Sequence, residues 1–136
     1  MGFDVDGWGT LEKDKIVICG EKISKDSRAK HPFEFRTNKG CGQYLFQALA
    51  KTGIKPGDIH IMNLWHKNGS QGDWEGALTL LQPKKIIAFG KKVQAELIRA
   101  NFENVEIPHP QFWKRFHYKD IIGYIKILQE AFDDSL

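Results

Sequence analysis

Three polar side chains stand directly behind short apolar runs, where strands would end. Glu21 follows Gly20 after Ile-Val-Ile-Cys, Asn63 closes Ile-His-Ile-Met, and His109 lies between two prolines after Val-Glu-Ile. A carboxylate can act as a general base or orient a water molecule. An amide offers the paired donor and acceptor that match the edge of a nucleobase. A histidine held between two prolines can donate to a developing anion.

Each of these side chains also has a purely structural interpretation. Glu21 can cap a surface turn, and Asn63 can satisfy the backbone of a loop. His109 can be a packed histidine with no chemical role. The sequence leaves both interpretations open at each position.

Aromatic and basic side chains form a second group of candidates. Phe33 and Phe35 can stack on a planar ligand, although one of them can equally serve loop packing. Phe112 lies beside Lys114 and Arg115, and nucleic-acid-binding surfaces combine cations with aromatic rings in this way. A plain solvated loop is the alternative for this segment.

Behind Gly90, two lysines open a predicted helix. The amino end of a helix attracts phosphate, so Lys91 is a candidate contact for it. The histidines and the two cysteines match no metal-ligand spacing, and both GxGxxG and GxxxxGK[ST] are absent. We therefore expect neither a metal nor a cofactor.

The composition fits one globular domain spanning residues 1–136, with 41% hydrophobic and 27% charged residues. A net charge of +3 permits a phosphate-bearing partner without requiring one. Cys19 and Cys41 provide no disulfide framework, which is typical of a reducing compartment. No apolar stretch approaches the ~20 residues of a membrane span, and no signal peptide is visible. We expect a cytoplasmic monomer that does not contact a membrane.

Apolar runs at 15–19, 59–64, 86–89 and 105–107 alternate with amphipathic helical patterns at 40–52, 74–81, 91–100 and 119–132. This alternation predicts an α/β fold with three layers, α/β/α, around a four-stranded parallel sheet. We expect the strand order 2-1-3-4, which would put the reversal between the first and third strands. Residues 1–14 read as an irregular lead-in. In the helix at 91–100 we expect Val93, Leu97 and Ile98 to face inward. The carboxyl ends of all four strands share one edge, so the three polar side chains would meet there.

Five segments, in this order, resemble the uracil-DNA glycosylase superfamily, most closely its iron–sulfur-bearing branch. The first strand and its Gly-Glu end are similar to the family's first motif, and IPHPQF is similar to its second, His-Pro-Ser. DIHIMNL resembles the strand whose terminal Asn reads the uracil edge. The segments are IVICGEK, HPFEFRTNKGCGQYLFQAL, DIHIMNL, PKKIIAFGKKVQAEL and IPHPQF, and the resemblance covers residues 15–132.

Three departures from that branch stand out. Lys22-Ile23-Ser24 replaces Ala-Pro-Gly in the first motif, and Gln111 replaces Ser in the second. The cluster-binding cysteines are absent, so we expect no iron–sulfur centre.

The resemblance implies a DNA glycosylase that flips a pyrimidine nucleotide into a pocket. Glu21 would position water or stabilise the cationic sugar, and His109 would donate to the departing base. The expected substrate-binding residues are Gly20, Lys22, Phe33, Phe35 and Asn63. The expected DNA-binding residues are Lys91, Gln111, Phe112, Lys114 and Arg115. Two alternatives stay open: a non-catalytic module of this fold that binds a base, nucleotide or protein, and an enzyme acting on a free nucleoside or nucleotide.

Overall fold

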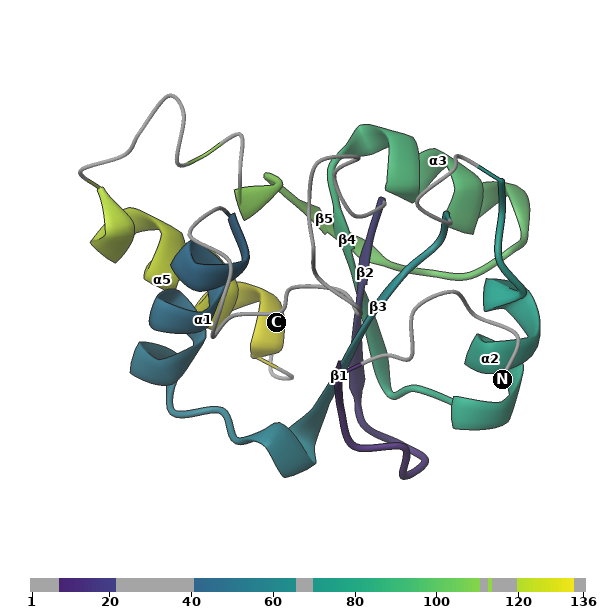
Figure 1. Ribbon diagram of the computed structural model, residues 1–136, viewed down its shortest axis with the longest axis horizontal. Coiled ribbons are helices and arrows are strands. Elements are labelled where there is room, and N and C mark those ends of the chain that lie inside the picture. Colours follow the sequence, from purple (N-terminus) through teal and green to yellow (C-terminus); the bar gives the residue numbers. More distant parts are fainter. Residues whose placement is uncertain (1–7, 22–40, 66–69, 111–112, 114–119, 134–136) are drawn as a thin grey trace.

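A computed structural model describes residues 8–21, 41–65, 70–110, 113 and 120–133. A central sheet separates two helical layers, as the α/β/α prediction requires (Figure 1). The strands are β1 Trp8–Gly9, β2 Ile16–Gly20, β3 Ile59–Asn63, β4 Lys85–Phe89 and β5 Val105–Ile107. The helices are α1 Cys41–Thr52, the 3-10 turn η1 Pro56–Asp58, α2 Trp74–Leu81, α3 Lys91–Arg99 and α5 Ile121–Phe132.

The sheet order is β1-β3-β2-β4-β5, and β3, β2, β4 and β5 run parallel. Those four strands confirm the predicted order 2-1-3-4. Strands β2 and β3 are buried along their whole length, which explains why β2 is a continuous apolar run rather than an alternating pattern. Strand β3 departs from such a run at the buried polar residues His60 and Asn63.

Alternate residues of the strands point to opposite faces of the sheet and pack into two separate hydrophobic cores. Ile18, Ile61 and Phe89 pack with α1 and α5 on one face. Cys19 and Ala88 pack with α2 and α3 on the other face. The period-two alternation of a strand divides the apolar residues between these layers, and each amphipathic helix covers one of them.

Residues Trp8–Gly9 correct the expectation of an irregular lead-in. They pair antiparallel with β3, and Thr10 N–H donates to the Ile59 carbonyl at 2.8 Å. Strand β1 therefore covers the edge of β3 that would otherwise stay unpaired. Two residues carry too little periodicity for a strand to be recognised from sequence.

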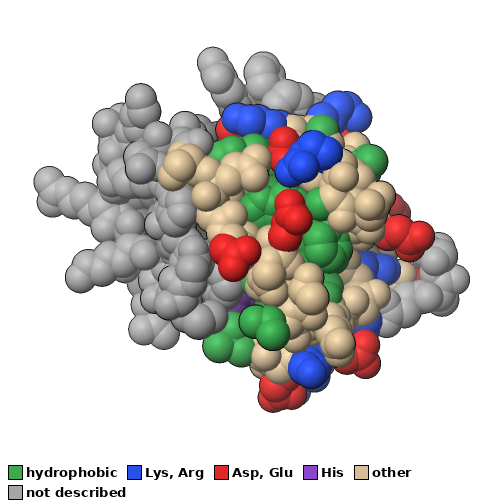
Figure 2. Space-filling model, turned by 90° about the vertical axis from the view of Figure 1, so that its right-hand side faces the viewer, with side chains coloured by type: hydrophobic (Ala, Val, Ile, Leu, Met, Phe, Trp, Pro, Cys, Tyr) green, Lys and Arg blue, Asp and Glu red, His purple; other side chains and the backbone are tan. Residues whose placement is uncertain are grey.

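The expected inward position of Ile98 is wrong, since its side chain is 60% exposed, whereas Val93 and Leu97 are buried. Ile98 and the exposed Leu80 of α2 belong to the helical layer that faces the viewer in Figure 2, where hydrophobic side chains lie among charged ones. Arg99 spans this layer, with ion pairs of 2.9 Å to Glu96 and 3.7 Å to Glu75. None of the described helices is long and apolar enough to cross a membrane.

Candidate functional site

The carboxyl ends of β2 and β3 form the base of the candidate site. Gly20 and Asn63 are partners in the parallel register, so the first two sequence candidates lie side by side. The pairing continues beyond the strands, because Leu64 N–H donates to Gly20 O at 3.0 Å and Trp65 N–H to Glu21 O at 2.9 Å. The backbone of Glu21 is thereby fixed at the edge of the sheet.

The side chain of Glu21 forms an ion pair that the sequence did not predict. Lys92 Nζ, in the first turn of α3, lies 2.8 Å from Glu21 Oε1. The same ammonium lies 4.8 Å from the centre of the Trp65 ring, in cation–π contact. The Glu21 side chain is 38% exposed, so it stays accessible to water or a ligand.

His109 follows β5 and is half-buried. Its ring meets Phe89 edge-on, with ring centres 5.7 Å apart. The backbone on both sides is fixed, because the Tyr124 hydroxyl donates to Pro108 O at 2.9 Å and Trp113 N–H donates to His109 O at 3.0 Å. The histidine is therefore held from α5 as well as by its two prolines.

Burial lowers the pKa of His109 from 6.5 to about 4, while the negative charge of Glu21 acts in the opposite direction. The imidazole is therefore neutral at pH 7 and keeps one N–H donor. Glu21 and His109 follow the carboxyl ends of β2 and β5, which lie on either side of β4 in the parallel part of the sheet. The structure thus places the carboxylate and the histidine that the sequence singled out at the same edge of the sheet.

Asn63 is only 5% exposed at the end of β3. Within the described part of the chain, no hydrogen bond involves its side-chain amide, and neither amide atom is a fully buried polar atom lacking a partner. The loop that Asn63 would satisfy lies outside the described residues, so both interpretations of Asn63 stay open. A buried amide at a strand end offers a donor and an acceptor that suit the recognition of a ligand edge.

Lys91 forms an ion pair with a different carboxylate from the one that Lys92 contacts. Its ammonium lies 3.3 Å from Glu106 Oε1 of β5, and its side chain is 88% exposed. The predicted phosphate contact of Lys91 is not tested by this geometry. Seven further candidates lie outside the described residues. They are Lys22, Phe33, Phe35, Gln111, Phe112, Lys114 and Arg115.

Sequence reasoning missed Lys92 and Trp65 as parts of the site. Successive helix residues differ by about 100° in direction, so only one of two adjacent lysines could face Glu21. Trp65 lies two positions behind Asn63, a signal that could have been used. Among the described residues, no group of three His, Cys, Asp or Glu side chains is placed to hold a metal.

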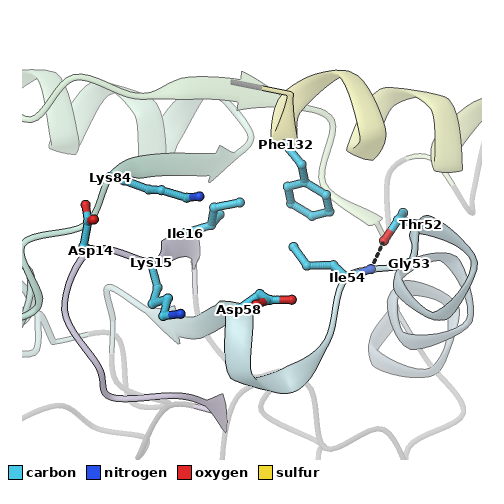
Figure 3. Close-up of a pocket in the computed structure, with 9 residues that line it drawn as sticks. All are labelled: Asp14, Lys15, Ile16, Thr52, Gly53, Ile54, Asp58, Lys84 and Phe132. Carbon is cyan, nitrogen blue, oxygen red and sulfur yellow. Dashed lines mark hydrogen bonds between the residues drawn. The ribbon is translucent and has the colours of Figure 1, made fainter. Parts of the chain in front are cut away.

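A cavity of about 330 Å³ lies at the opposite, amino edge of the sheet (Figure 3). Ile16, Ile54 and Phe132 supply its apolar wall, and Lys15 and Asp58 are among its charged residues. It contains none of the predicted site residues. We favour the carboxyl edge as the functional one, because ligands of open parallel sheets bind outside the carboxyl ends of the strands.

The chain was compared with known proteins. No protein-family model matches it, and no curated protein is significantly similar to it. Functional assignment therefore depends on the geometry of the site and on the motif resemblance described above.

Proposed function

We propose that the protein is a DNA glycosylase of the uracil-DNA glycosylase-like fold, which hydrolyses the N-glycosidic bond of uracil or a modified pyrimidine in DNA. The observation that carries the proposal is the placement of Glu21, Asn63 and His109 at the carboxyl ends of the parallel strands β2, β3 and β5. The pairing of Gly20 with Asn63 adds an amide beside the same edge. The order of the strands agrees with the resemblance.

In this mechanism the target nucleotide leaves the helical stack at a cost of a few kcal/mol. Asn63 pairs with the edge of the base through its amide. As the glycosidic bond breaks, Glu21 stabilises the cationic sugar or orients the attacking water. His109 donates its neutral N–H to the oxygen of the departing base anion, and no proton needs to be lost from the ring.

The remaining roles come from the sequence alone. Phe33 or Phe35 stacks on the base, and Lys22 contacts a phosphate or a substituent on a modified base. A separate surface holds the DNA, as expected for phosphate and stacking contacts in nucleic-acid recognition. Its residues are Lys91, Gln111, Phe112, Lys114 and Arg115.

The decisive experiment incubates the protein with oligonucleotides that carry uracil or modified pyrimidines, single- and double-stranded, and scores abasic sites. Removing a preorganised donor costs roughly 10²- to 10³-fold in rate, so His109→Ala should lose nearly all base release. Glu21→Gln should also be severely impaired. Glu130→Gln, which neutralises an exposed carboxylate on α5, is the matched control and should retain wild-type release. Failure of the wild-type protein to release any base from the panel would refute the proposal.

A second candidate is a base-binding module of the same fold without catalysis. The departures at Lys22-Ile23-Ser24 and at Gln111 favour it, because both fall in the two motifs that carry catalysis in the family that the chain resembles. Tight oligonucleotide binding without base release, unchanged in Glu21→Gln, would support this module. Binding of a free nucleoside that does not weaken with salt would instead indicate a small-molecule enzyme, since contacts to the phosphate backbone are steeply salt-dependent.

We further propose that the protein acts as a cytoplasmic monomer with DNA as its partner. A buried, unpaired Cys19 agrees with a reducing compartment. Light scattering of the purified protein with and without an oligonucleotide would measure the monomer and its complex.

A further inference from the structure

Lys92 is the one described cation in contact with the predicted catalytic carboxylate. It lies on α3, whereas Glu21 follows β2 and Trp65 follows β3. Three elements that are far apart in sequence therefore meet at one ammonium group. Its distances are 2.8 Å to Glu21 Oε1 and 4.8 Å to the centre of the Trp65 ring.

Trp65 holds both partners of this ion pair. Its backbone N–H donates to Glu21 O at 2.9 Å, and its indole ring lies beneath the Lys92 ammonium. The side chain of Trp65 is 8% exposed, and Gly72 N–H donates to Leu64 O at 2.9 Å just before it. A buried aromatic platform thus restricts where the Lys92 ammonium can lie.

This ion pair contributes little to folding stability. The Lys92 and Glu21 side chains are 65% and 38% exposed, and ion pairs between exposed groups are largely screened by solvent. Its main consequence is geometric. Oε1 is occupied by Lys92, and no described group bonds to Oε2.

We propose that Lys92 is the positioning residue for Glu21, holding the carboxylate by Oε1 so that Oε2 is presented to the water or the cationic sugar. This inference rests on the proposed glycosylase function and names a residue that acts through Glu21 rather than on the substrate. A misplaced catalytic group can cost 10²-fold even when binding is intact. The role of Lys92 is therefore expected in the rate of the chemical step.

The first experiment does not depend on activity. Residue-by-residue acetylation of the native protein, read by mass spectrometry, compares the wild type with Glu21→Gln. Loss of the ion pair should raise the acetylation rate of Lys92 about two- to fivefold, as expected for an exposed pair. Lys91, paired with Glu106, should be unchanged. An unchanged Lys92 rate would overturn the proposal, whatever the protein catalyses.

The second experiment measures single-turnover base release and oligonucleotide affinity in Lys92→Met, Lys92→Arg and Arg99→Met. Lys92→Met should lower the rate about 10- to 100-fold with the Kd within about twofold, and Lys92→Arg should restore most of the rate. Arg99→Met is the matched control, because it removes one cation and a 2.9 Å ion pair with Glu96 from the same helix. Its rate should stay within about twofold of the wild type.

The outcomes separate the inference from the proposed function. A wild-type rate in Lys92→Met, or an equal loss in Arg99→Met, would overturn the positioning role while base release itself stands. Weakened DNA binding with a salt slope lower by about 1 would make Lys92 a phosphate contact instead. An inactive wild-type protein would refute the glycosylase, and with it the catalytic part of this inference. The acetylation result would then still decide whether Lys92 holds Glu21.

Discussion

At the scale of single residues, His109 shows how packing sets chemistry. Desolvation lowers its pKa to about 4, and the opposing charge of Glu21 only partly compensates. A donor that is neutral over the physiological range stabilises a departing anion through a hydrogen bond. It does so without the cost of burying a cation, which an imidazolium ion would impose at the same position.

His109 should make folding stability depend on pH. Its folded pKa lies below the unfolded value of 6.5, so the unfolded chain binds more protons between those values. The contribution of the neutral His109 to the free energy of unfolding is complete above pH 6.5 and is lost as the pH falls to about 4. Protonation of His109 in the unfolded chain should therefore lower the free energy of unfolding by about 2–3 kcal/mol between pH 7 and pH 4.5. Urea unfolding at the two pH values measures this difference.

His109→Gln is the comparison for this measurement, because glutamine keeps polarity and does not titrate. Its stability should fall less between the two pH values than that of the wild type. Burial also lowers the pKa of His60, but that histidine is present in both proteins and its effect cancels. Parallel stability curves for the two proteins would contradict the assigned pKa.

At the scale of elements, helix α5 secures the turn that carries His109. Asp120 caps the helix by accepting from Gly123 N–H at 2.9 Å. One turn in, the fully buried Tyr124 donates to Pro108 O. The helix is thus tied to the residue immediately before the histidine.

Tyr124→Phe isolates this tie, because the ring that packs against Trp113 at 5.8 Å is kept. The lost hydrogen bond should lower the free energy of unfolding by about 1 kcal/mol, with a reduced rate of base release. Ile122→Ala, at a 67% exposed position of the same helix, is the control and should alter neither. Thermal unfolding and the abasic-site assay provide the two readings. Full activity in Tyr124→Phe would show that the prolines alone hold His109.

Strand β1 offers a second test at this scale. Gly9 has φ +108°, and a methyl group there would collide with the Ile59 carbonyl oxygen. Gly9→Ala should therefore cost about 2–3 kcal/mol, combining backbone strain with loss of the edge pairing. Gly53, with φ +85° and open space around it, should lose only about 1 kcal/mol on the same substitution. Equal losses in chemical denaturation would mean that β1 contributes nothing to stability.

At the scale of the whole molecule, the apolar runs were sufficient to predict the parallel sheet. Ile16, Ile18 and Ile87 lie in strands that are buried on both faces. Such strands are continuous apolar runs, which a single sequence is enough to recognise. The alternation of strands and helices then placed Glu21, Asn63 and His109 at one edge. The alternation alone does not determine the order of the parallel strands, although the predicted order 2-1-3-4 is the one observed.

Other features depend on contacts that sequence does not contain. Ile98 is apolar at a helical position near Leu97, yet it lies just outside the buried stripe of α3. The choice between Lys91 and Lys92 depends on the rotation of α3 about its axis, which only its packing on the sheet determines. The pairing of Trp8 with Ile61 spans more than fifty residues and leaves no local signal.

Cys19 provides a test of the molecule as one cooperative unit. Its thiol is fully buried in the central strand, and burial raises its pKa to about 12. Alkylation at pH 8, followed by mapping of the Cys19 peptide, should be blocked in the native protein and rapid in 6 M urea. The native rate should rise in parallel with global unfolding as urea is added. Fast alkylation without denaturant would mean that the centre of the sheet opens locally.

The cavity at the amino edge has a practical consequence for engineering this chain. The turn from Gly53 to Asp58 borders it, on the side of the sheet away from Glu21 and His109. An epitope or fluorophore inserted in that turn would leave the register of β2 against β3 untouched. A single added residue between Gly20 and Glu21 would instead move the carboxylate away from Lys92 and Trp65. The two ends of one sheet therefore differ sharply in how much redesign they tolerate.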